Sequence, residues 1–254
     1  MRDLYVRSIA LREMPPADSY VRSLPVVRHL ARQPVKFRSP VTFFVGENGA
    51  GKSTLIEALA ISLGFNPEGG SRNFRFSTED SHAPLSEYLR VARGPVRPRD
   101  GFFLRAESFY NVASNIDQLD REGGPGALLI NSYGGVSLHR QSHGESFLAL
   151  VEHRFGGRGL YILDEPEAAL SPGGIMRLLC AMDRLVRADS QFIVSTHSPM
   201  LTAFPGAEVL EITDGTLRSV PYTETAHFQI TRQFLNAPEK MLEYLLKSDP
   251  DPEE

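Results

Sequence analysis

The chain has 254 residues, of which 41% are hydrophobic, and its formal net charge is −4. This length allows one large α/β domain or two small ones, and the slightly acidic balance gives no general attraction to nucleic acid. The single cysteine, Cys180, excludes an intramolecular disulfide and is typical of a reducing cytoplasm. No apolar run approaches the roughly 20 residues that span a bilayer, and the N-terminus lacks the apolar core of a signal peptide. We therefore expect a folded cytoplasmic protein with no transmembrane segment of its own.

The first elements lead to a glycine-rich loop. Alternating apolar residues predict a leading strand over residues 1–13, which we expect to pair antiparallel. A short helix over residues 24–31 and a strand over residues 35–38 follow. Residues 41–45 then form a predicted buried strand, and apolar residues at helical spacing predict a helix after residue 54. The loop between them therefore has a strand before it and a helix after it.

The loop GENGAGKST fits the pattern G-x-x-x-x-G-K-[ST], in which backbone N–H groups surround the phosphates of a nucleotide. Glycine lets the backbone turn where a Cβ would clash, Lys52 supplies a cation for the β- and γ-phosphates, and Ser53 offers a hydroxyl to Mg²⁺. The following helix points its positive dipole end at the same anion. The alternative is an ordinary glycine-rich β–α turn. The predicted nucleotide contacts are Gly46, Glu47, Asn48, Gly49, Ala50, Gly51, Lys52, Ser53 and Thr54.

The middle of the chain is rich in Gly, Pro, Ser and Arg. We expect residues 66–140 to form an inserted subdomain of loops and a little sheet, with a short helix over residues 85–91. Strand character returns at residues 101–106, and a helix is predicted over residues 108–119. The densest basic run is either a solvated face or a contact with a phosphate-bearing or acidic partner. It consists of Arg90, Arg93, Arg97 and Arg99.

The second half alternates helices with strands. The segment SHGES precedes an apolar helix face, and a predicted strand over residues 159–163 runs into Asp164. A helix over residues 171–188 places Cys180 among apolar neighbours, so we expect a buried thiol. A strand over residues 191–195 follows. The last predicted elements are a hairpin (residues 209–212 and 217–220), two helices (residues 226–235 and 238–246) and an acidic tail (residues 248–254).

Two carboxylates follow a buried strand at the end where open α/β sheets bind ligands. Asp164 is placed to hold the Mg²⁺ shell through water, and Glu165 to orient or deprotonate an attacking water. His197 follows another buried strand and is placed to donate a hydrogen bond to a γ-phosphate. The alternatives are an acidic helix N-terminus favoured by the helix dipole and a structural histidine at a strand end. With the loop lysine, the candidate catalytic residues are Glu165, His197 and Lys52.

Four segments, in this order, resemble the ATP-binding-cassette (ABC) type of ATPase. The phosphate loop is followed by SHGES, which is similar to the family's LSGGQ signature, then by LYILDEP, similar to its Walker B strand, and by STHSP, similar to its histidine switch. The resemblance spans residues 41–199. The short acidic signature, the EPEAALSP run and the compact size look more like the non-transporter branch, the RecF-like and SMC-like predicted ATPases of the AAA family, than like transporter subunits.

The resemblance implies a composite active site. In the family, the N-terminus of the signature helix contacts the γ-phosphate bound to the other subunit, so a complete site needs a homodimer around two MgATP. The matching residues here are Ser142, Gly144 and Glu145, and the sequence departs from the signature at Gln141 and His143. A second reading, compatible with the first, is that Ser142 caps the helix and Glu145 completes a capping box.

Two family positions have no matching motif. By position, Glu107 is the best candidate for the glutamine-loop residue that completes the Mg²⁺ shell, with Asn111 and Gln118 behind it. Phe37 and Tyr20 are the options for stacking on adenine, although core packing is favoured for Phe37. The expected metal contacts are therefore Ser53, Asp164 and Glu107.

The sequence thus predicts an α/β P-loop NTPase of ABC type. We expect a mixed central sheet flanked by helices, an N-terminal antiparallel β portion, a core from residues 1–65 and 141–222, an insertion over 66–140, and C-terminal helices over 223–247. The expected function is ATP binding and hydrolysis with Mg²⁺ by a stand-alone homodimer linked to nucleic-acid repair, defence or regulation. The alternatives are the ATP-binding subunit of a membrane transporter and a slow ATP-dependent dimerisation switch. A nucleic-acid or protein partner is expected at residues 66–120.

Overall fold

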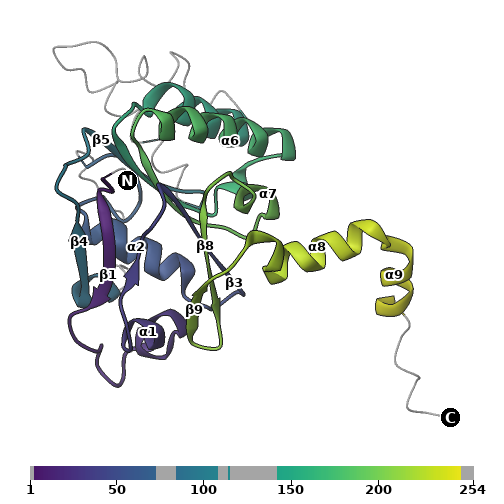
Figure 1. Ribbon diagram of the computed structural model, residues 1–254, viewed down its shortest axis with the longest axis horizontal. Helices are drawn as coiled ribbons and strands as arrows, with labels where there is room; N and C mark the ends of the chain where they lie inside the picture. Colours follow the sequence, from purple (N-terminus) through teal and green to yellow (C-terminus); the bar gives the residue numbers. More distant parts are fainter. Residues whose placement is uncertain (1–2, 73–83, 108–113, 115–141, 247–254) are drawn as a thin grey trace.

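The computed structural model of the protein describes residues 3–72, 84–107, 114 and 142–246. Its larger sheet has six strands in the order β5-β6-β7-β3-β8-β9, all parallel except the edge strand β9 (Figure 1). This mixed sheet flanked by helices confirms the predicted fold class. The strands are β3 (Val41–Gly46), β5 (Asp100–Arg105), β6 (Gly159–Asp164), β7 (Gln191–Ser195), β8 (Glu208–Thr213) and β9 (Thr216–Ser219).

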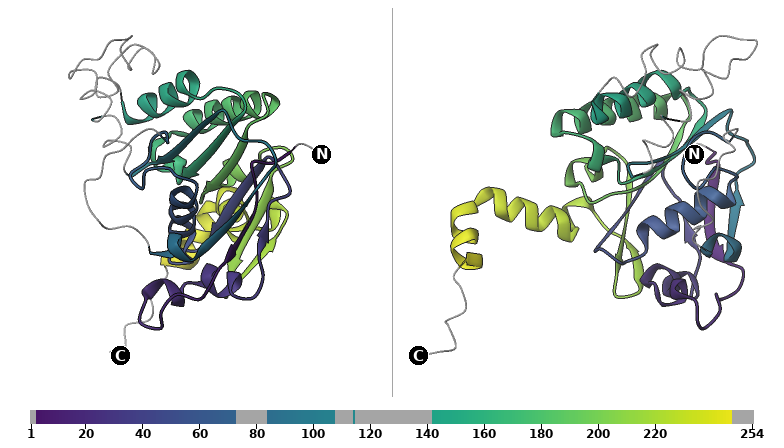
Figure 2. Two further views of the ribbon diagram at one scale, coloured as in Figure 1. Left: turned by 90° about the vertical axis from the view of Figure 1, so that its left-hand side faces the viewer. Right: turned by 180° about the vertical axis from the view of Figure 1, so that it is seen from behind.

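Helices cover both faces of this sheet, so its central strands are buried along their whole length (Figures 1 and 2). Successive side chains point to opposite faces: Phe43 lies in the core beneath α6, whereas Phe44 lies in the core beneath α1 and α2. Phe37 packs edge-on against Phe44, with ring centroids 6.2 Å apart, which confirms its place in the core. The flanking helices are α1 (Pro25–Leu30), α2 (Lys52–Ser62), α5 (His143–Ala149) and α6 (Pro172–Arg187).

The smaller sheet has the order β2-β1-β4, with β1 (Val6–Leu11) pairing antiparallel to β2 (Val35–Lys36) and to β4 (Leu89–Arg93). The predicted leading antiparallel strand is confirmed. The predicted helix over residues 85–91 is wrong beyond its first turn, because α3 covers Leu85–Tyr88 and the chain then continues as β4. Pairing with β1 supplies the backbone partners that a short isolated helix would lack.

Two strands of the sheets lie inside the segment that was expected to be an insertion. Both β4 and β5 lie within residues 66–140, yet each belongs to one of the two sheets. Residues 84–107 are therefore part of the core, and β5 brings its C-terminal end beside that of β6. The predicted helix over residues 108–119 lies outside the described residues apart from residue 114.

Helix α6 corrects the expectation of a buried cysteine. Its buried positions include Ile175, Leu178 and Leu185, which recur at helical spacing and face the sheet. Cys180 lies between these positions on the outer face and is exposed. The apolar neighbours in sequence misled the prediction, because adjacent helical residues point in different directions.

The chain ends in a two-helix arm, α8 (Ala226–Asn236) and α9 (Pro238–Leu246), which extends away from the body (Figures 1 and 2). It follows the predicted β8–β9 hairpin, whose turn residues Asp214 and Gly215 both have positive φ. No residue of either helix is buried. The large apolar side chains exposed on the arm are Ile230, Leu235, Leu242, Tyr244, Leu245 and Leu246. Over the described ranges, no helix is both long and apolar enough to cross a membrane.

Candidate functional site

The parallel sheet gathers its polar strand ends at one edge. Arg105 at the end of β5 pairs in register with Asp164 at the end of β6, and Asp164 pairs with Ser195 at the end of β7. Strand β3 lies next to β7 and ends at Gly46, where the phosphate loop begins. Ligands of open α/β sheets bind at this carboxyl edge. The segments that the sequence singled out therefore meet at one place.

The phosphate loop requires glycine at particular positions. Gly46 has φ +144°, and a Cβ there would lie 2.7 Å from the carbonyl oxygen of Ile212 on the neighbouring strand β8. Gly51 has φ +90°, and a Cβ there would lie 2.8 Å from Val26 on α1. The backbone thus turns at left-handed conformations, close to other elements, and α2 begins directly after it at Lys52. This geometry exposes backbone N–H groups at a helix N-terminus, as phosphate binding requires.

Lys52 lies at the centre of this edge. Its side chain is buried, and Nζ donates hydrogen bonds to the carbonyl oxygens of Gly46 (2.8 Å) and Glu47 (3.0 Å). Burial lowers the pKa of Lys52, and the carboxylates of Glu165, Asp164 and Glu167 oppose that shift. The cation is thus placed among three carboxylates and the loop backbone, where an anionic ligand would compensate its desolvation.

Asp164 is the buried carboxylate of the site. The hydroxyl of Ser195 donates to its Oδ1 at 2.5 Å, and Arg105 Nε lies 3.5 Å from its Oδ2. Burial raises the pKa of Asp164, and its hydrogen bonds with Ser195 and Ser53, together with the charge of Arg105, oppose the shift. The Ser53 hydroxyl and this carboxylate are thus adjacent oxygen donors, the type of ligand that Mg²⁺ takes.

Glu165 has a strained backbone. Its φ is +48° and ψ +53°, a left-handed conformation that costs a non-glycine residue roughly 1–3 kcal/mol and that clusters at functional sites. The Glu165 N–H donates to the Ser195 carbonyl at 3.1 Å, which holds the residue at the end of β7. Its carboxylate is partly exposed and lies 3.4 Å from Nε2 of His197. The strained backbone thus places the Glu165 carboxylate beside His197, just after β6 ends.

His197 links the sheet edge to the C-terminal arm. Its backbone N–H donates to Glu167 Oε1 at 2.5 Å, and its Nδ1 lies 2.9 Å from Nε2 of His227, near the start of α8. Burial lowers the pKa of His227, and the neighbouring His197 and Lys52 lower it further. One imidazole nitrogen therefore donates to the other, and the first turn of α8 belongs to the same edge as Lys52.

The signature segment makes a separate, exposed structure. Ser142 caps α5 and forms a complete capping box with Glu145: Ser142 Oγ and N donate to Glu145 Oε2 at 2.6 and 3.1 Å, and Glu145 N donates back to Ser142 Oγ at 3.3 Å. These hydrogen bonds lower the pKa of Glu145. A Cβ on Gly144 would lie 2.9 Å from the carbonyl oxygen of Ala169, so α5 packs closely against the 3-10 turn Pro166–Ala169 that follows Glu165.

Glu107 lies at the margin of the site. Its side chain is 86% exposed, and its carboxylate is 3.7 Å from Arg105 Nη2. Arg105 itself lies between three carboxylates, with Glu57 Oε2 at 3.1 Å and Asp164 on the other side. The structure thus places an arginine, rather than the glutamate, beside Asp164. Asn111 and Gln118 lie outside the described residues, and Tyr20 is exposed.

The donors at this edge fit MgATP. The loop offers backbone N–H groups at a helix N-terminus, Lys52 is a buried cation, and Ser53 with Asp164 supplies two hard oxygen ligands. Within the described residues no group of three or more His, Cys, Asp or Glu side chains is arranged to hold a metal by itself. Mg²⁺ is commonly held by one or two protein oxygens plus the nucleotide's phosphates, so this sparse donor set suits it. The parallel sheet and the glycine-rich loop before α2 together have the P-loop fold.

Comparison with known proteins makes the class more specific. The profile of a family described as "AAA domain" matches residues 21–97, and that of one described as "AAA domain, putative AbiEii toxin, Type IV TA system" matches residues 135–203. The chain is 26% identical over 179 residues to an uncharacterized ABC transporter ATP-binding protein of Haemophilus influenzae, a match that covers 65% of this chain and 67% of the relative. The chain is thus similar to AAA-type domains in two separate segments and to an ABC-type ATP-binding protein over most of its length.

Another relative is similar over a shorter span, and one solved structure shares the fold. The chain is 41% identical over 70 residues to DNA repair protein RAD50 of Drosophila melanogaster, which is 27% of this chain but 5% of that protein. The structure titled "An inward-facing conformation of a putative metal-chelate type ABC transporter" shares the fold, with 13% identity, a TM-score of 0.50, and coverage of 89% of this chain and 88% of the other. The SMC head domain from Thermotoga maritima matches with a TM-score of 0.43 at 17% identity, over 86% and 99% of the two chains.

Sequence reasoning missed three residues at this edge. Ser195 was assigned only to a buried strand, yet its hydroxyl contacts Asp164. Arg105 lies at the end of a strand that the sequence predicts. Its place beside Asp164 could not be predicted, because it depends on the parallel pairing of β5 with β6. His227 lies 30 residues from His197, and no local pattern joins the two.

Proposed function

We propose that this chain binds and hydrolyses ATP at the carboxyl edge of its larger sheet, and that two copies form each complete site. The arrangement of Lys52, Asp164, Glu165 and His197 carries the proposal. One buried cation, one buried carboxylate, one partly exposed carboxylate and one histidine meet beside a glycine-rich loop. Each group has a distinct task in phosphoryl transfer to water.

Binding is assigned to the loop and the start of α2. The backbone N–H groups of Gly46 to Thr54 surround the β- and γ-phosphates, and Lys52 Nζ exchanges its carbonyl partners for phosphate oxygens. Ser53 and Asp164 would hold Mg²⁺, and the further contact assigned to Glu107 would have to come from the margin of the site, because Arg105 lies beside Asp164. When bound, Mg²⁺ neutralises negative charge on the phosphate oxygens.

Turnover is assigned to Glu165. Its carboxylate orients a water molecule in line with the γ-phosphorus and accepts a proton as the water oxygen bonds to phosphorus. The bond between the γ-phosphorus and the bridging oxygen breaks, and ADP and phosphate are released. His197, 3.4 Å from Glu165, donates a hydrogen bond to the γ-phosphate, and Lys52 stabilises the charge on the leaving oxygen.

The second copy is proposed to supply Ser142, Gly144 and Glu145. The Ser142 hydroxyl and the N-terminus of α5 are exposed, and they suit the γ-phosphate of a nucleotide held by another chain. The exposed apolar side chains of the α8–α9 arm also support an assembly, because monomeric proteins seldom leave such surface uncovered. Dimerisation around two MgATP would bring the two halves together.

The process coupled to hydrolysis is proposed to be nucleic-acid repair, defence or regulation in the cytoplasm. The RAD50 relative is named as a DNA repair protein, and one matching family carries a toxin–antitoxin description. The Haemophilus influenzae relative supports the alternative of a transporter's ATP-binding subunit. A nucleic-acid or protein partner is assigned to residues 66–120. Stimulation of hydrolysis by DNA or RNA would favour the first role, and stimulation by a permease in lipid vesicles would favour the second.

The substitution Glu165→Gln tests the enzymatic proposal. We expect it to keep ATP binding and to lower steady-state phosphate release about 10²- to 10⁴-fold, because the amide cannot accept the water's proton. Glu152→Gln, which removes a carboxylate paired with Arg177 elsewhere on the surface, is the matched control and should keep the parental rate. Phosphate release by Glu165→Gln at the parental rate would show that Glu165 does not carry the reaction.

A further inference from the structure

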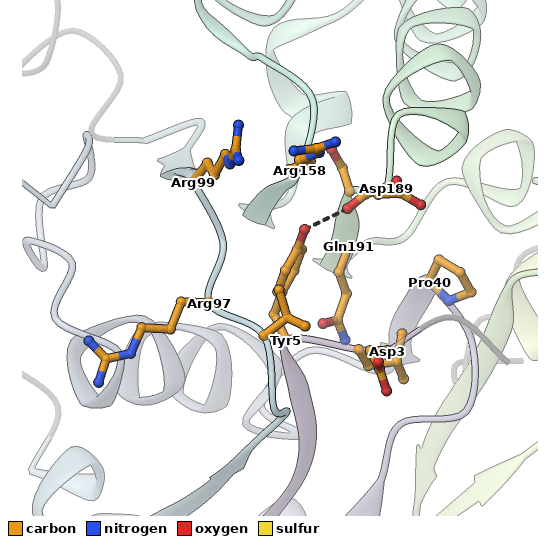
Figure 3. A pocket seen from close by; sticks show the side chains of 11 residues that line it. Asp3, Tyr5, Pro40, Arg97, Arg99, Arg158, Asp189 and Gln191 are labelled. Carbon is orange, nitrogen blue, oxygen red and sulfur yellow. Dashed lines mark hydrogen bonds between the residues drawn. The ribbon is translucent and has the colours of Figure 1, made fainter.

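A second concave site lies at the opposite edge of the larger sheet. It has a volume of about 370 Å³ and is lined by residues that precede β5, β6 and β7, together with residues of the N-terminal segment (Figure 3). The parallel strands run five or six residues from this edge to the nucleotide site, roughly 15–20 Å at the usual rise per residue. The pocket is therefore separate from the phosphate loop.

Backbone hydrogen bonds fix the arginines at this pocket. Arg99 N–H donates to the Arg158 carbonyl at 2.9 Å, and Arg158 N–H donates to the Ala188 carbonyl at 2.6 Å. Arg158 and Asp189 both have positive φ, at +58° and +61°. Three loops that are far apart in the sequence are thus joined side by side. The joined backbone sets where the Arg99 and Arg158 side chains emerge, as Figure 3 shows.

The polar side chains in the wall opposite these arginines already have hydrogen-bond partners within the protein. Tyr5 Oη donates to the Asp189 carbonyl at 2.8 Å (Figure 3). The Gln191 amide bonds to both backbone groups of Val6, accepting from N–H at 2.9 Å and donating to the carbonyl at 3.0 Å. Leu4, Pro40 and Val96 add apolar surface. The apolar part of a ligand would pack against this rigid wall, and a negative charge on the ligand would face the guanidinium groups.

The pocket has an excess of positive charge. Three arginines line it, Arg97, Arg99 and Arg158, and all three are exposed. Within the part of the chain that the structure describes, no carboxylate lies within 4.0 Å of their guanidinium nitrogens. Of the two acidic residues in the lining, Asp3 is paired with Arg7 at 3.4 Å. The other, Asp189, has contacts of its own.

The charges act on the Tyr5 hydroxyl inside the pocket. Burial raises the pKa of Tyr5 and Asp189 adds to the shift, whereas Arg158 and Arg99 oppose it. Both guanidinium groups are therefore near the same point of the wall. Arg97 lies on the same side of Tyr5 as Arg99, and its guanidinium points away from Tyr5 (Figure 3), so Arg99 and Arg158 are the cations near the hydroxyl.

We propose that this pocket binds the phosphate group of a phosphate ester, with Arg99 and Arg158 as its main donors. Guanidinium groups match the geometry of phosphate oxygens, and the apolar wall would receive the organic part of the ester. One of the four arginines in the densest basic run, Arg99, thereby gains a role that the nucleotide site does not use. The inference does not rest on ATP hydrolysis, because the binding is measured without ATP.

The test measures binding of two probes to the full chain, thymidine monophosphate by calorimetry and a labelled ten-nucleotide oligothymidylate by fluorescence anisotropy. The double variant Arg99→Gln/Arg158→Gln should weaken binding at least about tenfold, because it removes both positively charged donors to the phosphate. The control Arg90→Gln/Arg218→Gln removes the same charge from exposed positions elsewhere and should stay within about twofold. Binding of the mononucleotide identifies a small free ester, and binding of the oligonucleotide alone identifies a phosphate of a nucleic-acid strand.

Thermal melting decides whether the double variant can be interpreted. If it melts below the parent, Arg99→Gln alone is measured, since Arg99 lacks the positive φ of Arg158, and a loss of about threefold or more is expected. The proposal is overturned if neither probe binds at millimolar concentration. It is also overturned if the pocket and control variants lose affinity equally, because binding would then follow net charge alone.

Discussion

The proposed site has two halves that differ in how far they are buried within this chain. The phosphate-loop half contains Lys52 and Asp164, and the signature half contains Ser142 and Glu145. Lys52 and Asp164 are buried at the sheet edge. Hydrogen bonds and an ion pair with residues of neighbouring strands and the loop stabilise their charges. Ser142 and Glu145 are exposed, and they form hydrogen bonds with each other and with the turn of α5 that follows. One half is built into the fold, whereas the other is a preformed helix end on the surface.

This difference separates two kinds of residue. A defect in the phosphate-loop half should damage nucleotide binding within one chain. A defect in the signature half should leave binding by that chain intact and damage what two chains do together. Variants in the two halves should therefore fail in different assays.

The largest effect is expected from Gly46→Ala. A Cβ at this position would meet the Ile212 carbonyl at 2.7 Å, and φ of +144° is strained for alanine, so we expect a loss of about 1–3 kcal/mol in the free energy of unfolding and loss of ATP binding. Gly49→Ala is the control, because Gly49 has φ +79° but nothing within 4 Å of its Cβ position. It should cost only about 1–2 kcal/mol. Denaturant titration and nucleotide binding provide the comparison, and equal ATP affinity in Gly46→Ala and the parent would contradict it.

Ser142→Asp should separate the capping role of Ser142 from its proposed contact with phosphate. Aspartate is a good N-cap, but its carboxylate would face that of Glu145, which accepts from Ser142 Oγ at 2.6 Å. Ser142→Asp and Ser142→Ala should therefore lose a similar amount of unfolding free energy, roughly 1 kcal/mol each. The added negative charge should repel the γ-phosphate, so Ser142→Asp should bind ATP as the parent does but fail to dimerise in light scattering with saturating MgATP. A Ser142→Asp chain that dimerises and turns over normally would leave Ser142 with the cap alone.

The smallest effect is expected from His227→Ala. It removes the partner 2.9 Å from His197 Nδ1 and should lower turnover about fivefold, which corresponds to the loss of one hydrogen bond of ~1 kcal/mol. His227→Gln places a polar nitrogen near the same point and should recover part of the rate. Since the hydrogen bond of His227 is to His197 rather than to the phosphate loop, ATP binding should be unchanged in both variants. A rate that falls equally in both would favour a packing role for His227.

The sequence was most informative where function depends on a local pattern. The phosphate loop, the strand ending in Asp164 and the strand before His197 each combine a buried strand with polar residues at its end, and the structure brings them to one edge. The ABC-type fold was predictable for the same reason, because the order of these segments is part of the pattern. The catalytic and binding roles of the residues stay predictions.

The remaining features depend on contacts between distant segments. Arg105 meets Asp164 because β5 is the edge strand next to β6, and His227 meets His197 because α8 starts beside the loop. Neither neighbour has a signature in the local sequence. Cys180 is different, since the spacing of Ile175, Leu178 and Leu185 already placed it on the outer face of α6. That signal was present and was outweighed by the apolar residues next to it in the chain.

Mixing two inactive variants tests the composite site most directly. In a symmetric dimer, a chain with Glu165→Gln spoils the site on its own loop, and a chain with Ser142→Asp spoils the site on its partner's loop. A heterodimer of the two therefore keeps one site in which both halves are intact. When the two chains are combined as monomers in equal amounts and MgATP is added, phosphate release should recover to at most about a quarter of the parental rate, because the other site of each heterodimer still places the aspartate of Ser142→Asp against a γ-phosphate. A mixture that releases phosphate no faster than the average of the two variants measured alone would contradict a site shared between two chains.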